Sequence, residues 1–245
     1  MKKRNWFACA VGVLSSFTLV MASGPVSATT IVATQTGTIW DSAGSDSTVF
    51  GVTGGTLDGL TYTAIATYDT ALGAPHFVVG GDGVLGGTLY DGSIYAGPSP
   101  VSATLTINGV TISFDGFYSG EADSSNDPAL GGVFQDSFDY SYVDQYNNTS
   151  KDIKLYTVGN GQLFPNSIAT PPSGNVCLIS VICDGHFNIY QVQNGVVVQA
   201  AGMFAATSYT FAAVPEPKTW AMMLVGLGGL GVVLRSRRRQ SLAVV

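Results

Sequence analysis

The sequence predicts an all-β protein whose central region folds as a two-layer β-sandwich of jelly-roll type. Three observations predict this class. Short runs of alternating apolar and polar residues recur along residues 29–213, two Asn-Gly pairs join such runs, and no long 3.6-residue periodicity separates them. All-β units reach about 200 residues as single domains. We therefore expect one β-sandwich domain over residues 29–213.

The clearest hairpin surrounds Asn108 and Gly109, which favour a two-residue turn. In residues 101–107 and 110–114 apolar residues alternate with hydroxyl-bearing ones. The register set by the turn puts every apolar residue on one face and every hydroxyl on the other. The predicted pairs are Ala103 with Phe114, Thr104 with Ser113, Leu105 with Ile112, Thr106 with Thr111, and Ile107 with Val110.

A second hairpin is predicted around Asn194 and Gly195, between residues 187–193 and 196–199. Its alternation is less regular, so it is either buried on both faces or located at a sheet edge. The remaining segments are assigned by the same criteria. Strands are expected over 60–68, 134–142, 153–158 and 203–211, and loops over the glycine-rich stretches 51–59 and 80–87.

The N-terminus has the pattern of an export signal. Basic residues at positions 2–4 precede an apolar stretch over 6–21, and Val26-Ser27-Ala28 supplies the small residues that signal peptidase accepts. We expect cleavage after Ala28, which makes residues 1–28 a signal peptide. The alternative is a permanent N-terminal membrane helix.

The C-terminus has the pattern of a short membrane anchor. A transmembrane helix is expected over 219–234, where the apolar run from Trp220 would span roughly 22 Å against a hydrocarbon core of about 30 Å. Trp220 suits one interface, and basic residues after the helix remain in the cytoplasm, together with residues 240–245. These basic residues are Arg235, Arg237, Arg238 and Arg239.

The segment before this helix is an extended, acidic neck. Pro215 and Pro217 fix their own φ near −65° and push the preceding residues out of the helical region, which leaves Glu216 on an extended backbone that a protease cleft can bind. Thr219 can cap the helix that follows. The order of these elements over residues 214–239 resembles the PEP-CTERM sorting signal in its PEPxxWA form. Its matching positions are Pro215, Glu216, Pro217, Trp220 and Ala221, followed by the arginine cluster.

This resemblance implies a processing partner. PEP-CTERM tails are substrates of exosortase, a multi-pass membrane enzyme of Gram-negative bacteria that make exopolysaccharide. The mature protein would then lose its tail and pass to the cell surface or matrix. The one departure is Lys218, where such tails often have a small residue. An ordinary membrane anchor with a proline-rich neck is the alternative.

Charge is distributed unevenly along the chain. Of its 16 acidic residues, all but Glu216 lie between residues 29 and 214, where Lys151 and Lys154 are the only basic residues. Nucleic acid is excluded as a partner, because phosphate binding needs a basic surface. An acidic domain also repels acidic polysaccharide unless divalent ions bridge the two. We expect neutral glycans, metal ions or other proteins as partners.

Cys177 and Cys183 are the cysteines that remain after signal removal, and an oxidising compartment favours a disulfide between them. A straight strand would separate their Cα atoms by about 20 Å, whereas a disulfide spans roughly 4.4–6.8 Å. The bond therefore requires a turn near Ser180. Free buried thiols are an alternative, as is a metal site with His186 as a third ligand.

The acidic residues suggest two other kinds of site, for calcium binding and for glycoside hydrolysis. Asp123, Ser125 and Asp127 have the spacing of the first ligands of a calcium loop, but glycine and the final glutamate are missing from it. We expect a solvated acidic loop over 121–127, with an adventitious calcium site as the alternative, and we predict no metal site and no cofactor. Glu121 and Asp139 could serve a glycosidase.

Neither GxSxG nor HExxH occurs in the chain. Because so many carboxylates are present, a suitable acidic pair is easy to find by chance. We therefore predict no catalytic residue and no enzymatic activity. The aromatic row Phe138, Tyr140 and Tyr142 could stack on sugar rings, but core packing is the favoured interpretation.

These expectations define a function. The chain is expected to be exported across the inner membrane, held transiently with its C-terminus in the cytoplasm, and then processed to the cell surface or exterior. There it would be a non-enzymatic binding or structural component associated with exopolysaccharide or biofilm. A secreted polysaccharide hydrolase that carries the same tail is the alternative.

Overall fold

The computed structural model describes the central region and a short piece of the tail. The described residues are 30–42, 44, 46–78, 81–87, 98–114, 119–127, 135–144, 150–160, 167–177, 181–193, 196–214 and 223–228. The predicted signal peptide with Ala28 lies outside them. So do Pro215, Glu216, Pro217, Trp220, Ala221 and the four arginines.

Eleven strands of the described region form one antiparallel sheet. The order across the sheet is β3-β4-β7-β8-β9-β10-β11-β1-β2-β5-β6, so β1 and β11 are neighbours in its interior. A 3-10 helix, η1 (Ser47–Phe50), follows the first strand. The strands are β1 (Thr30–Trp40), β2 (Thr61–Asp69), β3 (Ala74–Val78), β4 (Gly81–Gly86), β5 (Val101–Ile107), β6 (Val110–Phe114), β7 (Ser119–Asp127), β8 (Gln135–Asp144), β9 (Ser150–Asn160), β10 (Val181–Gln193) and β11 (Val196–Val214).

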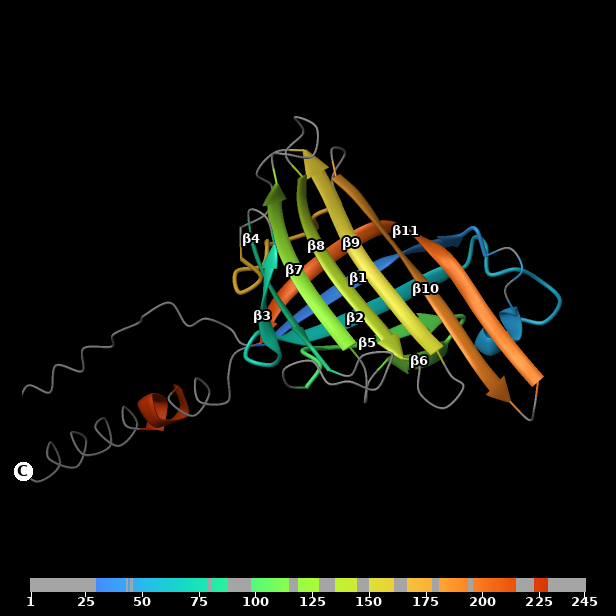
Figure 1. The fold of residues 1–245 in the computed structure, drawn as a ribbon, viewed down its shortest axis with the longest axis horizontal. Coiled ribbons are helices and arrows are strands. Elements are labelled where there is room, and N and C mark those ends of the chain that lie inside the picture. Colours follow the sequence, from blue (N-terminus) through green and yellow to red (C-terminus); the bar gives the residue numbers. More distant parts are fainter. Residues whose placement is uncertain are drawn as a thin grey trace, which may run out of the picture.

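The predicted all-β class is confirmed, but the layers arise from a single sheet that curls over itself. Strands β7 to β9 cross in front of β1, β2 and β5 (Figure 1). A β-bulge between Thr36 and Gly37 shifts the register of β1 against β11, and such bulges increase local twist and bend. A Cβ atom at Gly37 would meet the carbonyl oxygen of Ala205, so the bulge requires glycine.

The hydrophobic core fills the inside of this curl. Phe204 of β11 stacks on Tyr62 of β2, with ring centroids 4.3 Å apart, and on Phe187 of β10, with centroids 5.6 Å apart. Strands from both sides contribute further side chains that are fully or almost fully buried. They include Ile31, Ala33, Leu105, Ile107, Phe114, Ile153, Leu155 and Ile189.

The first predicted hairpin is confirmed to the residue. β5 and β6 have the predicted bounds and all five predicted pairs, from Ala103 opposite Phe114 to Ile107 opposite Val110. Asn108 and Gly109 have φ values of 49° and 77°, as a two-residue turn of this type requires. On the polar face the hydroxyls of Thr106 and Thr111 are 2.8 Å apart.

The other predicted strands overlap with β2, β8, β9 and β11, although the predictions over 60–68 and 134–142 begin one residue early. The second hairpin joins β10 to β11 with Gln193 opposite Val196, while its turn lies outside the described residues. Neither alternative for this hairpin is correct. Both strands are interior to the sheet, yet the tip is solvated, with Val192, Val196 and Val197 between 40% and 63% exposed.

Two predicted loops are strands instead. Residues 81–86 form β4, where glycine allows close strand packing: a Cβ at Gly83 would collide with the side chain of Asp123. Residues 121–127 belong to β7 rather than to an acidic loop. The glycine-rich stretch 51–59 is irregular, as predicted.

Part of the predicted transmembrane helix is described. Residues 223–228 are helical, and Met223, Leu224, Val225 and Leu227 are exposed. Within the described parts of the chain, no helix has the length and apolar character needed to cross a membrane.

Candidate functional site

The two boundaries of the central domain lie side by side. β1 begins at Thr30 and β11 ends at Val214, and the antiparallel register places these residues directly opposite each other (Figure 1). Ile31 likewise faces Ala213. On its other side Thr30 faces Asp69, the last residue of β2. The chain therefore enters and leaves the domain at the same end of the sheet.

The end of β11 is held less firmly than its middle. β10 pairs with β11 only up to Ala205. Beyond that point a short segment takes the place of β10: Val176 donates its backbone N–H to the carbonyl oxygen of Tyr209 (2.9 Å), and Asn175 Oδ1 accepts from the Tyr209 N–H (3.0 Å). After Thr210, among the described residues, β11 pairs with β1 alone. Residues 212–214 are exposed.

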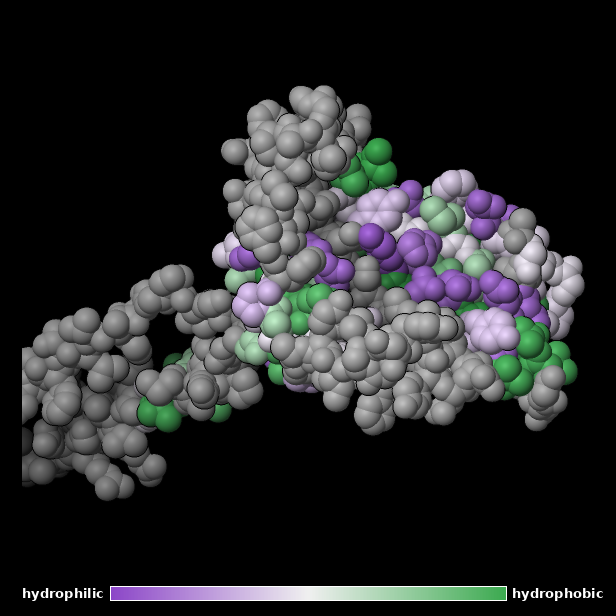
Figure 2. Space-filling model, viewed as in Figure 1, coloured by the Kyte–Doolittle hydropathy of each residue, from purple (hydrophilic) through white to green (hydrophobic). Residues whose placement is uncertain are grey.

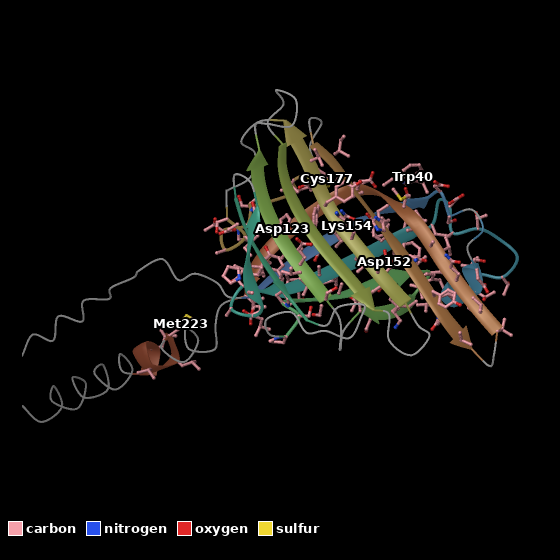
Figure 3. All side chains as sticks on the ribbon, viewed as in Figure 1. Trp40, Asp123, Asp152, Lys154, Cys177 and Met223 are labelled. Atoms are coloured by element: carbon pink, nitrogen blue, oxygen red, sulfur yellow. A yellow bond between two sulfur atoms is a disulfide. The ribbon has the colours of Figure 1, made fainter. Side chains whose placement is uncertain are left out.

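A disulfide anchors that short segment. Cys177 and Cys183 are bonded, with Cα atoms 5.5 Å apart (Figure 3). Cys183 lies in β10, so the bond ties the segment that flanks β11 to the adjacent strand. Ser180, where a turn was expected, lies outside the described residues.

A sequence profile places the start of the tail within this geometry. The profile of the PEP-CTERM protein-sorting motif matches residues 213–239. The chain carries a PEP-CTERM sorting motif. It covers the C-terminal tail, as the resemblance indicated, and supports an exported protein that is sorted by exosortase. Neither the curated proteins nor the solved structures contain a match to the chain.

The motif begins inside the sheet. Its first two residues, Ala213 and Val214, are the last two residues of β11. Pro215, the next residue in the sequence, has no backbone N–H that could donate to a ladder. The PEP-CTERM motif is thus continuous with the folded domain.

A second surface feature is the outer face of β9 and β10, which is polar. His186 Nε2 lies 3.3 Å from Asp152 Oδ2, and Lys154 Nζ lies 5.8 Å from the ring centroid of Tyr156. Hydrophilic residues form a band across this face (Figure 2), with Asp152 and Lys154 on β9 (Figure 3). Asn188, Tyr190 and the exposed Gln199 extend the same face onto β10 and β11.

The predicted aromatic row is on the opposite face. The register pairs Phe138, Tyr140 and Tyr142 of β8 with buried residues of β9. Directly opposed residues share a face of the sheet, so these three register positions lie on the same face as the buried residues of β9. The packing of the three side chains lies outside what the structure describes, so core packing stays a prediction. The partners are Thr157, Leu155 and Ile153 respectively.

The acidic candidates lie along paired strands. Asp123 faces Asp139 across β7 and β8, and Glu121 faces Ser141. Residues two apart in a strand are separated by roughly 6.5 Å along its length, so the backbone that carries this series is extended and does not form a calcium loop. Among the described residues, no group of three or more His, Cys, Asp or Glu is placed to hold a metal ion.

β1, the strand that pairs with the first two residues of the motif, was not predicted from the sequence. Its inward-facing row is interrupted by Gln35, a polar residue with no exposed surface. Gln35 Nε2 donates to the carbonyl oxygen of Asp184 (3.0 Å), and its Oε1 accepts from the Tyr62 hydroxyl (2.9 Å). Burial raises the pKa of Tyr62 well above its ordinary value, and the charge of Asp184 adds to the effect.

Proposed function

We propose that the protein is a non-enzymatic component of the cell surface or extracellular matrix, delivered there by exosortase. It is exported with its C-terminus left in the cytoplasm, freed from its signal peptide by signal peptidase after Ala28, and separated from its tail at the membrane. The observation that carries this proposal is the PEP-CTERM motif joined without a spacer to a folded β domain.

The polar face of β9 and β10 is the surface we assign to matrix binding. Tyr156 and Tyr190 are half-buried there, and Asn188 and Gln199 supply amide groups beside them. Aromatic rings with neighbouring amides suit sugar rings and their hydroxyl groups. Because the domain is acidic, a neutral glycan of an exopolysaccharide or biofilm is the ligand class that fits best.

Routing is tested by removing the motif's charge. Glu216→Gln, or deletion of residues 235–239, leaves uncleaved precursor in the membrane of a host that has exosortase. Asp41→Asn, which removes an exposed carboxylate from the domain, is the matched control and leaves processing unchanged. Immunoblotting and mass spectrometry of the mature C-terminus provide the measurement. Normal release of both tail variants would refute exosortase routing.

Ligand binding is tested on a glycan array with the mature protein. Tyr156→Ala weakens binding by up to about tenfold, since an aromatic contact contributes roughly 0.5–1.5 kcal/mol. Tyr156→Phe keeps the ring and retains most of the affinity. Release of reducing sugar from a bound polysaccharide would instead assign a hydrolase.

A further inference from the structure

The sorting motif and the last strand of the domain share residues. The motif match begins at Ala213, while β11 continues to Val214. Their partners in the sheet are Ile31 and Thr30, at the start of β1. The enzyme that processes the motif therefore meets a substrate whose first two positions are already paired with another strand.

The two sides of this ladder differ in how firmly they are held. β1 is also paired with β2, and Ile31 and Ala33 have no exposed surface. Residues 212–214 have exposed side chains and, in the described part of the chain, pair with β1 alone. Opening this end therefore detaches the last residues of β11 and leaves β1 in the sheet.

Cleavage of an extended neck requires access to its backbone. A peptide in a β-ladder has to open locally before an enzyme surrounds it, and the rate then depends on the population of the open form. The end of the sheet also presents apolar surface, since Leu72 in the turn after β2 and Val214 are 38% and 41% exposed.

We propose that β1 clamps the first two residues of the sorting motif, and that exosortase engages the sheet end formed by Thr30, Val214 and the turn at 69–73, opening this ladder before it cuts. The inference rests on the proposed routing by exosortase. It adds that the rate of processing is set by the last pairs of β1 with β11.

A reversible lock tests the clamp in the full chain, expressed in the native host. The double variant Thr30→Cys with Val214→Cys links directly opposed residues once exported to an oxidising compartment. Conversion of precursor to mature protein becomes about tenfold slower, because the enzyme is denied the opening of one or two backbone hydrogen bonds. Mild reductant restores the rate, relative to unmodified protein treated in the same way.

A matched lock controls for the disulfide itself. Thr38→Cys with Ala205→Cys links another directly opposed, exposed pair of the same two strands, far from the motif. This variant is processed at the unmodified rate. Equal slowing by both locks would overturn the clamp.

A spacer tests the opposite direction. Inserting Gly-Ser-Gly-Ser between Val214 and Pro215 gives the enzyme unpaired backbone directly before the Pro-Glu-Pro sequence, and processing becomes about threefold faster or more. The clamp is refuted if the spacer leaves the processing rate unchanged and the disulfide introduced at positions 30 and 214 forms fully without slowing processing. Exosortase routing would still stand. Normal processing of both Glu216→Gln and the variant that lacks residues 235–239 would instead refute the routing itself, and the clamp with it.

Discussion

The two ends of the β1–β11 ladder are built for different tasks. At the far end Trp40 Nε1 donates to the carbonyl oxygen of Phe204 (3.2 Å). Residues 46–60 also contact this end, with backbone hydrogen bonds to Ile39 and Gln199, and contain the fully buried Phe50 and Leu57. At the near end Val214 is exposed and the PEP-CTERM motif begins. One strand thus contributes stability through its middle and accessibility through its last residues.

The largest expected effect on stability comes from a substitution at the far end of the β1–β11 ladder. Phe204→Ala removes a ring that has no exposed surface and is stacked on both Tyr62 and Phe187. The free energy of unfolding falls by about 3–5 kcal/mol, the usual range for a buried phenylalanine. Urea denaturation of the mature protein measures the loss. A change below about 1 kcal/mol would show that the core is not centred on this ring.

The second effect loosens the flank of β11 between the two ends. Replacing Cys177 and Cys183 by alanine releases the segment that bonds to Tyr209. Closure of a loop this short predicts a loss of about 2 kcal/mol. Hydrogen exchange then increases at Tyr209 more than at Phe204, and equal changes at both amides would contradict the local role of the disulfide.

The third effect concerns the buried amide within β1. Gln35→Leu leaves the Tyr62 hydroxyl without the acceptor it has in the native protein, at a cost of about 1–2 kcal/mol. The double variant with Tyr62→Phe recovers part of the loss, because both polar partners are then removed. Thermal unfolding of the two variants provides the test, and a double variant less stable than Gln35→Leu would argue against the paired network.

A smaller effect concerns how the stability of the far end of the ladder depends on pH. Asp58 accepts hydrogen bonds from the Ser42 hydroxyl (2.7 Å) and backbone N–H (2.8 Å), and these bonds lower the pKa of Asp58 below its ordinary value of 3.8. Since the folded pKa is the lower one, the stabilisation is fully present above pH 3.8 and is lost as the pH falls through the folded pKa. Asp58→Asn therefore weakens the dependence of stability on pH in the acid range, which urea denaturation at a series of pH values measures.

The smallest effect belongs to the near end. Val214→Ala changes the free energy of unfolding by less than about 0.5 kcal/mol, because the side chain is exposed and at the end of its strand. The same denaturation experiment as for Phe204→Ala measures it. A loss above about 1 kcal/mol would mean that both ends of the ladder stabilise the domain.

The range of the interactions explains what the sequence could predict. The hairpin around Asn108 and Gly109 was predicted to the pair because turn chemistry and alternation act over a few residues. The PEP-CTERM tail could also be recognised from the sequence, since a linear motif is defined by its order of residues and not by the fold. The disulfide was predicted from the oxidising compartment and the two cysteines that remain after signal removal. Its position beside β11 was not predicted.

The missed elements depend on distant partners. β1 pairs with a strand at the other end of the chain, and its buried Gln35 makes sense only with Tyr62 and Asp184 in place. β7 buries small residues where its side chains are described, such as Ala122 and Ser124, and the carboxylates that alternate with them are locally typical of a loop. The curling of one sheet into two layers likewise has no local signature.

The pairing of β1 with β11 also determines the stage of export at which this ladder can form. The strand of the domain that emerges first from the export channel pairs with the strand that emerges last. The β1–β11 ladder therefore cannot form until nearly the whole domain has crossed, whereas ladders between consecutive strands, such as β8 with β9, need no such delay.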